Sequence, residues 1–128
     1  MKTILDASAL LALVFGEPGA DIVAAQAKTS RILSVNFSEV VQKVISIDGN
    51  PDRAEEAVDL LGIQVVPFDR RLARLTAELR AKTSFMGASF ADRACLALGL
   101  ATGAPILSSD QDWQKLGREL INRIHISA

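Results

Sequence analysis

The sequence is poor in the residues that many catalytic centres use. Its 128 residues include one histidine, one cysteine and no tyrosine. A single imidazole, His125, argues against histidine-based triads and against zinc, and we expect it to be structural or on the surface. The single thiol, Cys95, cannot form an internal disulfide, and its apolar neighbours predict a buried core residue. These absences direct attention to the carboxylates.

Long apolar runs are also missing. No stretch reaches the roughly 18–20 residues that span a bilayer, and the first apolar run contains an aspartate and ends in Gly-Glu-Pro, unlike a secretory signal. We therefore expect a soluble, cytoplasmic protein with no membrane partner. The length predicts one domain, residues 1–128. The 49% hydrophobic content and mean hydropathy of +0.25 indicate that a partner or a second copy covers part of its surface.

There is no large excess of charge of either sign. A net charge of −1 and a pI near 5.8 argue against a protein that coats nucleic acid through bulk electrostatics. Cations are nevertheless concentrated in residues 70–93, at Arg70, Arg71, Arg74, Arg80, Lys82 and Arg93. Two interpretations stay open. The segment is a local basic strip, or it is a solvated helix face on which Arg74 pairs with Glu78 at i, i+4.

Apolar periodicity and turn residues predict strands that alternate with helices. The expected strands cover residues 3–6, 31–35, 63–67 and 105–108, with an edge strand at 123–126. The expected helices cover residues 8–15, 18–28, 36–47, 51–61 and 70–82, then an almost wholly apolar segment that Ser89 caps, and a short segment ending near Leu116. This alternation predicts an α/β fold in which helices cover both faces of a mostly parallel sheet of four to five strands.

Four acids are expected at one edge of this sheet. Asp6 ends the first strand, Glu39 lies in the first helical turn after the second, and Asp110 follows the fourth. Asp92 opens the buried helix before the fourth strand, and such a crossover helix starts near the carboxyl edge of the preceding strand. In parallel sheets, ligands bind at this edge. Four carboxylates without histidine or cysteine suit Mg²⁺ or Mn²⁺, which would offset their mutual repulsion.

Most of these acids also have a structural interpretation. Glu39 stands three residues after Asn36, and Asp92 three after Ser89, which is the spacing of a capping box. Asp110 or Asp112 would cap the short helix that follows. Asp6 caps nothing obvious, and an unpaired buried carboxylate is costly, so the functional interpretation is strongest there.

Three segments together resemble the PIN-domain ribonucleases, and more narrowly the VapC-like toxins of bacterial toxin-antitoxin pairs. They are ILDASALLALVFGEPGA, NFSEVV and SFADRACLALGLATGAPILSSDQDW. The resemblance implies a PIN-like three-layer α/β/α fold. It places the four family acids on Asp6, Glu39, Asp92 and Asp110, and the family's hydroxyl residue on Ser108, where threonine is commoner. Ser8 also fits the pattern, and Asp112 ranks below Asp110 as a metal ligand.

The resemblance further implies a metal-dependent endoribonuclease. Carboxylates would hold Mg²⁺ or Mn²⁺, and the ions would activate water for in-line attack on an RNA phosphodiester. It also implies a homodimer whose acidic site is covered by a segment of a cognate antitoxin. Arg93 and the basic run after Asp69 are hypothetical phosphate contacts, because RNA must approach a negative pocket.

Two other functions stay open. A receiver-like signalling domain also binds Mg²⁺ at strand ends and would use Asp69 as its phosphoacceptor, but the sequence offers one acid after the first strand and no lysine after the last. An Asp-x-Asp phosphatase fails similarly, because position 8 is serine. The remaining alternative is a PIN fold that binds without turnover, and the intact set of acids argues against it.

Overall fold

The computed structural model describes residues 2–110, Trp113 and the backbone of residues 123–125. The strands in this part of the chain are β1 (Thr3–Leu5), β2 (Ser30–Leu33), β3 (Gln64–Val66), β4 (Ile106–Ser108) and β5 (Arg123–His125). The α-helices are α1 (Ala7–Phe15), α2 (Ala20–Gln26), α3 (Ser34–Asp48), α4 (Asp52–Leu61), α5 (Arg70–Thr83) and α6 (Phe90–Thr102). Two 3₁₀ turns, η1 (Ala27–Thr29) and η2 (Ser84–Met86), follow α2 and α5.

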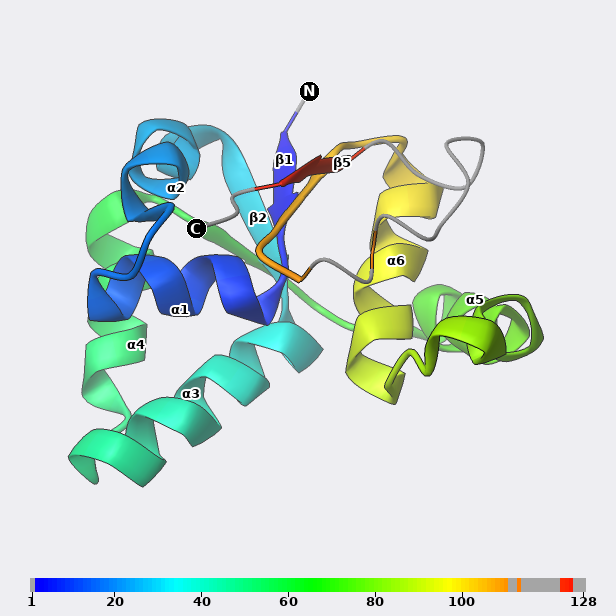
Figure 1. Ribbon diagram of the computed structural model, residues 1–128, viewed down its shortest axis with the longest axis horizontal. Helices are drawn as coiled ribbons and strands as arrows, with labels where there is room; N and C mark the ends of the chain where they lie inside the picture. The colour runs from blue at the N-terminus through cyan, green and yellow to red at the C-terminus, as the bar shows by residue number, and fades with distance from the viewer. Residues whose placement is uncertain (1, 111–112, 114–122, 126–128) are drawn as a thin grey trace.

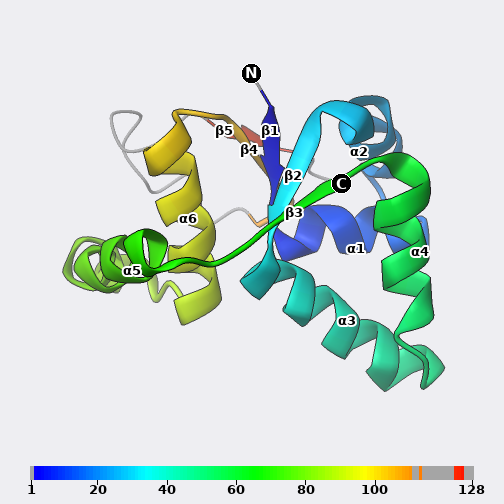
Figure 2. The same ribbon diagram turned by 180° about the vertical axis from the view of Figure 1, so that it is seen from behind.

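The described strands form one parallel sheet in the order β3-β2-β1-β4-β5. The central strand is β1, where Ile4 lies opposite Arg31 of β2 on one side and Ile106 of β4 on the other. The chain moves outward from β1 to β3 and then returns to the opposite side at β4 (Figures 1 and 2). The boundary between β1 and β4 is therefore a topological switch point, where sheets of this kind bind ligands beyond the carboxyl ends of the strands.

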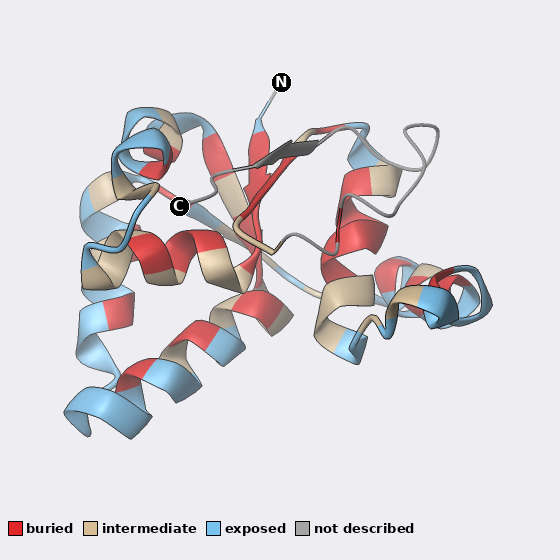
Figure 3. Cartoon of the chain, viewed as in Figure 1, coloured by how far each residue is buried: buried red, intermediate tan, exposed pale blue. Residues whose placement is uncertain are grey.

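Helices cover both faces of the sheet, as the three-layer prediction requires. Neighbouring residues of one strand enter different cores: Ile4 packs with side chains of α5 and α6, whereas Leu5 packs with those of α1 to α4. The same alternation holds for Ile106 and Leu107 in β4. Both faces of the inner strands are consequently buried (Figure 3). This burial explains the continuous apolar runs of these strands, which are typical of parallel sheets. The predicted α/β fold is confirmed.

The junction between β2 and α3 lies earlier than the sequence predicts. The strand was expected at residues 31–35 and the helix from Asn36, whereas β2 ends at Leu33 and α3 begins at Ser34. Leu33 is extended at the N-cap position and gives the helix no side-chain hydrogen bond. The apolar periodicity becomes clear only at Phe37, which explains the error. Asn36 is therefore inside the first turns of α3 and does not cap it.

Other boundaries agree more closely. Asp69 caps α5 by accepting a hydrogen bond from the Leu72 amide at 2.9 Å, and Ser89 caps α6. Gly16 closes α1 in the left-handed conformation, with φ 64°. The helix expected over residues 18–28 begins only at Ala20 and finishes as the 3₁₀ turn η1. The short helix expected to end near Leu116 falls largely outside the described residues.

The strand order contradicts the receiver-like alternative. Receiver-type sheets have the order 2-1-3-4-5, which puts the third strand beside the first. Here β2 separates β3 from β1, so Asp69, which follows β3, is not next to the strand that Asp6 follows. The side chain of Asp69 is instead the N-cap of α5. Asp69 therefore has a structural role.

Within the described residues, no single helix is long and apolar enough to cross a membrane. Two helical segments, Ala7–Phe15 and Ala20–Thr29, meet the length and hydropathy requirement only when taken together, and they bend by 106° at the break between them.

Candidate active site

Asp6 lies directly after β1, at the switch point, and only 6% of it is exposed. Its Oδ1 accepts hydrogen bonds from the Ala9 amide at 2.9 Å and from the Ser8 hydroxyl at 2.6 Å, so Asp6 is the N-cap of α1. The expectation that it caps nothing is wrong, because α1 begins one residue earlier than predicted. The cap does not fully compensate the buried charge. Desolvation raises the pKa of Asp6 to about 6, against the lowering effect of hydrogen bonds from Ser108, Ser8 and Ala9, and the charge of Asp92 adds to the rise.

Two serines connect the end of β1 with the end of β4. The Ser8 hydroxyl accepts a hydrogen bond from the Ser109 amide at 3.0 Å and lies 3.5 Å from the Ser108 hydroxyl. Ser108 is 1% exposed, and its Oγ accepts a hydrogen bond from the Asp110 amide at 3.0 Å. The segment that carries Asp110 is thus attached to the segment that carries Asp6. The family resemblance predicts Ser108 as a site residue, but the sequence gave no sign that Ser8 reaches across to β4.

Glu39 and Asn36 form a second part of the site, on α3. Asn36 is 2% exposed, and its Nδ2 donates to Glu39 Oε1 at 3.2 Å and to the Ala91 carbonyl at 3.0 Å. Both partners are acceptors, which fixes the orientation of the amide. Asn36 therefore connects α3 to the start of α6 and holds Glu39, a role that the predicted capping box missed. Partial burial raises the pKa of Glu39, the Asn36 bond lowers it, and the charge of Asp92 raises it.

Asp92 has the structural role that its spacing predicts. The Asp92 amide donates to Ser89 Oγ at 3.1 Å, and the Ser89 amide donates to Asp92 Oδ2 at 3.0 Å, which completes a capping box. Its charge nevertheless raises the pKa of both Asp6 and Glu39. The pKa of Cys95, a buried core thiol as predicted, is raised by burial and then by the charges of these three acids. Asp6, Glu39 and Asp92 therefore share one electrostatic environment. The starts of α1, α3 and α6 lie close together in Figure 1.

The donor chemistry of this environment fits a hard divalent cation. In the described part of the chain, the ion pairs are Arg53–Asp48 and Arg74–Glu78, so no basic side chain there forms an ion pair with Asp6, Glu39 or Asp92. Burial and mutual repulsion raise the pKa of two of these acids, and a bound cation would relieve both costs. Among the described residues, however, no three His, Cys, Asp or Glu side chains already form a group that could hold a metal ion. The acids would need to adjust around an ion.

The remaining predicted residues lie in different settings. Arg74 and Glu78 form the predicted i, i+4 ion pair, with 3.4 Å between Nε and Oε1. Arg93 is half-buried, and its Nη1 donates to the Thr76 carbonyl of α5 at 3.5 Å. His125 belongs to the predicted edge strand, β5, of which the backbone alone is described. Asp112 lies outside the described residues.

A parallel sheet that gathers carboxylates at its switch point defines a class of α/β domain, and a family comparison identifies it. The model of the PIN domain matches residues 3–119. The chain belongs to the PIN-domain family. A comparison with curated protein sequences finds no match.

Several solved structures with the same fold are VapBC or other toxin-antitoxin complexes. One is VapBC2 from Rickettsia felis, bound to a DNA fragment from its promoter, with a TM-score of 0.75, 14% identity and 98% of each chain covered. Another is a toxin-antitoxin complex from Klebsiella pneumoniae, with a TM-score of 0.72, 16% identity and coverage of 88% of this chain and 90% of that one. A third is VapBC-5 from Mycobacterium tuberculosis, with a TM-score of 0.60, 16% identity and coverage of 99% and 98%. At these identities, the likeness shows the fold.

Proposed function

We propose that this protein is a metal-dependent endoribonuclease that hydrolyses RNA phosphodiester bonds as the VapC-like toxin of a toxin-antitoxin pair. One observation carries the proposal: Asp6 is buried at the switch point with a pKa raised to about 6, and the charge that adds to this rise belongs to Asp92. The fold needs an N-cap at this position, but an uncharged asparagine would cap α1 about as well, so capping alone does not explain a buried, incompletely compensated carboxylate. PIN domains are typically nucleases and generally depend on metal ions, which supports the same conclusion.

The proposed ligands of Mg²⁺ or Mn²⁺ are Asp6, Glu39, Asp92 and Asp110. When bound, the ion supplies an activated water and stabilises the charge that develops on the leaving oxygen. The chain holds the ligands in position by hydrogen bonds. Ser8 and the Ala9 amide orient Asp6, Asn36 orients Glu39, and the Ser89 amide orients Asp92. Ser108, which hydrogen-bonds Asp6 and the Asp110 amide, would maintain the spacing between the first and last of these acids.

The proposal includes a cognate antitoxin and a homodimer. A hollow of about 470 Å³ reaches Ser8 and Ser109 of the site and is otherwise lined by the apolar side chains of Leu11, Phe15 and Ile47 and by Glu17 and Lys43. Ile47 is 56% exposed, so a partner that covers it gains apolar contact area. An antitoxin segment with apolar side chains fits this surface. The complexes formed by the structural relatives, from Rickettsia felis and Klebsiella pneumoniae among others, support the choice of partner.

Purified protein incubated with a panel of structured RNAs tests the proposal. We expect cleavage with Mn²⁺, no cleavage with a chelator, and none by the Asp6→Asn variant. Asp59→Asn is the matched control, because it makes the same chemical change at an exposed position of α4 and should cut as the wild type does. Equal cleavage by wild type and Asp6→Asn would show that the assigned site is wrong. Binding of Mn²⁺ and RNA without cleavage would instead indicate a PIN domain that binds without turnover.

A further inference from the structure

The start of α5 carries positive charge that the helix itself does not need. Among its 14 residues are five cations and one acid, and the first two residues are Arg70 and Arg71. Helix N-termini favour acids, because the helix macrodipole is positive there, yet the first turn of α5 has none. Both arginines are exposed, and neither forms an ion pair with any described residue. The N-cap Asp69 supplies one negative charge beside these two cations, so the start of α5 keeps an excess of positive charge that is open to a ligand.

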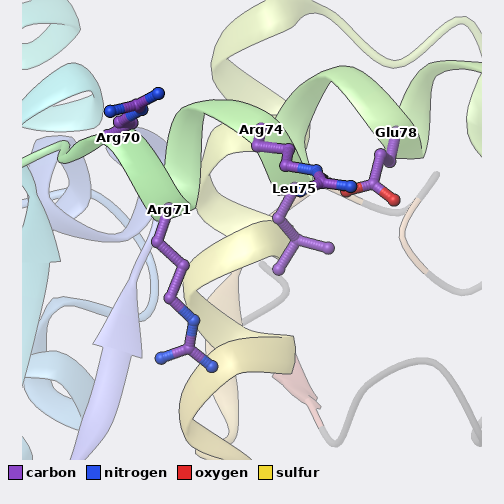
Figure 4. Close-up of a pocket in the computed structure, with 5 residues that line it drawn as sticks. All are labelled: Arg70, Arg71, Arg74, Leu75 and Glu78. Carbon is purple, nitrogen blue, oxygen red and sulfur yellow. Dashed lines mark ion pairs between the residues drawn. The ribbon is translucent and has the colours of Figure 1, made fainter.

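These arginines line a concave surface. Together with Arg74, Leu75 and Glu78 they border a hollow of about 710 Å³ (Figure 4). The figure shows Arg71 extending alongside α6 while Arg74 lies along α5 toward its partner Glu78. All five lining residues belong to α5, and their three guanidinium groups point to different sides of it, with a single carboxylate among them. Guanidinium groups bind phosphate oxygens through paired hydrogen bonds, so this hollow suits phosphate groups.

An exposed aromatic ring connects this hollow to the acids. Phe68, two residues before α5, packs edge-on against Phe90, the first residue of α6, with 5.9 Å between ring centroids. Phe90 is 52% exposed and stands two residues before Asp92. The Arg93 guanidinium lies 5.8 Å from the Phe90 ring centroid while its Nη1 reaches the Thr76 carbonyl of α5. Phe68 and Arg93 therefore hold Phe90 between the start of α5 and the candidate active site.

We propose that an arginine surface binds single-stranded RNA that flanks the phosphodiester to be cut. This surface consists of Arg70, Arg71, Arg74 and Phe90. The inference rests on the proposed function, which makes RNA the substrate. The acids repel phosphates, so a substrate strand needs a cationic surface nearby, and the arginines contact its phosphates. The exposed part of the Phe90 ring stacks with a base. Stacking requires an unpaired base, and basic surfaces that carry exposed aromatic rings are typical of single-strand binding.

This assignment changes the role of Arg93. The sequence offered it as a phosphate contact, whereas the structure packs it between α5 and α6, half-buried and against the Phe90 ring. Arg93 is a positioning residue for Phe90. The phosphate contacts are the exposed arginines at the start of α5.

Binding of a fluorescent, ten-nucleotide single-stranded RNA, measured by anisotropy at several salt concentrations, tests the electrostatic part. All proteins carry Asp6→Asn and are kept in chelator, so nothing is cut. We expect Arg70→Ala/Arg71→Ala to bind at least tenfold more weakly at low salt. The slope of log affinity against log salt should also fall by about 1.4, because each lost phosphate contact on a single strand removes about 0.7. Arg80→Ala/Lys82→Ala is the matched control. It removes the same charge from the same helix, about 15 Å further along, and should bind within about twofold of the parent.

Phe90→Leu tests the stacking part. It keeps an apolar side chain against Phe68 but removes the aromatic face, so we expect about a fivefold or greater loss of affinity with an unchanged salt slope. Phe90→Tyr keeps the aromatic face and should bind with the affinity of the parent. An RNA of the same length without bases should bind Phe90→Leu and the parent equally, because it has nothing to stack. The role of the ring would be contradicted if Phe90→Tyr bound as weakly as Phe90→Leu. It would also be contradicted if Phe90→Leu lost as much affinity for the abasic strand as for the RNA with bases.

The outcomes separate this inference from the proposed function. Unchanged affinity and salt slope in Arg70→Ala/Arg71→Ala would overturn the arginine surface, whether or not the wild-type protein cuts RNA. An equal loss in Arg80→Ala/Lys82→Ala would also overturn it, because bulk charge would then explain the binding. Weakened binding in Arg70→Ala/Arg71→Ala alone, in a protein that cuts no RNA with Mn²⁺, would support the surface and contradict the nuclease proposal alone.

Discussion

The carboxylates of Asp6, Glu39 and Asp92 and the arginines at the start of α5 are both clusters of like charge, but the fold treats them differently. Each of these acids accepts hydrogen bonds from groups of the protein, and burial raises the pKa of Asp6 and Glu39. Arg70 and Arg71 are exposed and have no ion-pair partner among the described residues. The fold therefore restricts the movement of the acids more than that of the arginines. Under the two proposals, these hydrogen bonds limit how far the acids move when they close around an ion, whereas the exposed arginines can follow a flexible strand.

The largest expected effect comes from removing the buried charge. Asp6→Asn should lower RNA cleavage by roughly 10³-fold or more, because a group that stabilises charge in the reaction is lost. The metal-free protein should become more stable at pH 7, since the amide oxygen still accepts from Ser8 and Ala9 while the buried charge is gone. Cleavage rates and urea unfolding in chelator measure the two effects. A loss of both activity and stability would mean that Asp6 matters chiefly as a cap.

The pH dependence of the free energy of unfolding should reveal the buried charge of Asp6 without a mutation. Between pH 3.8 and about 6 the unfolded chain has Asp6 ionised, while the folded protein keeps it protonated. The folded state then binds more protons, so this carboxyl group makes the free energy of unfolding fall as pH rises through that window. The contribution is fully present below pH 3.8, and about 3 kcal/mol of it is lost above pH 6.

Urea unfolding of the metal-free protein from pH 4 to pH 7, compared with Asp6→Asn, isolates this contribution from the other acids. The wild type should lose stability relative to the variant as pH rises. Identical pH dependence in the two proteins would mean that the pKa of Asp6 is not raised. Excess Mg²⁺ should reduce the loss, because the ion favours the ionised carboxylate.

Asn36→Ala tests how firmly the acids are positioned. We expect cleavage to fall by about 10- to 100-fold, as is typical when a group that orients a metal ligand is removed. The Asn36 bond lowers the pKa of Glu39, so its loss should also move the acidic limb of the pH-rate profile to higher pH. Gln42→Ala, on the exposed side of the same helix, is the control. A uniform loss of rate at every pH would indicate a purely structural role for Asn36.

Removing the cap of α6 should have a smaller effect. Ser89→Ala deletes the hydroxyl that accepts from the Asp92 amide and should cost about 1 kcal/mol of stability by urea unfolding. Ser46→Ala is the comparison, since its exposed hydroxyl only donates to the Lys43 carbonyl within α3. That variant should differ little from the wild type. Equal effects of the two substitutions would remove the support for a cap at Ser89.

The smallest effect is expected at the arginines. Arg70→Ala/Arg71→Ala should leave stability unchanged or raise it by about 0.3 kcal/mol per residue at low salt, the low end for exposed side chains, because cations at a helix N-terminus oppose the macrodipole. Thermal and urea unfolding check this in the same samples that serve for RNA binding. A clear loss of stability would show that the arginines support the fold and would break the contrast with the acids.

The sequence predicted the features that depend on local pattern. Strands buried on both faces give continuous apolar runs, and β1 and β4 were recognised in this way. Asp6 and Asp110 follow these strands directly, so their place at the switch point came from chain order alone. The capping box of Ser89 and Asp92 was also recognised from its spacing.

The sequence did not predict the contacts that join distant segments. Asn36 donates to the carbonyl of Ala91, 55 positions away, and the Ser8 hydroxyl accepts from Ser109, 101 positions away. No local pattern encodes such a partner. The pKa of Asp6 is equally beyond reach from the sequence, because burial by the assembled helices is its first cause. The raised pKa values therefore had to come from the structure.

The pairing of β1 with β4 also has a consequence for biosynthesis. Ile4 pairs with Ile106, so one edge of β1, the first strand of the chain, stays unpaired until β4 has been synthesised. A ribosome that has made the first hundred residues has already incorporated Asp6, Glu39 and Asp92, but neither Ser108 nor Asp110. A nascent chain of that length therefore carries an incomplete candidate site, which only the last segment of the chain completes.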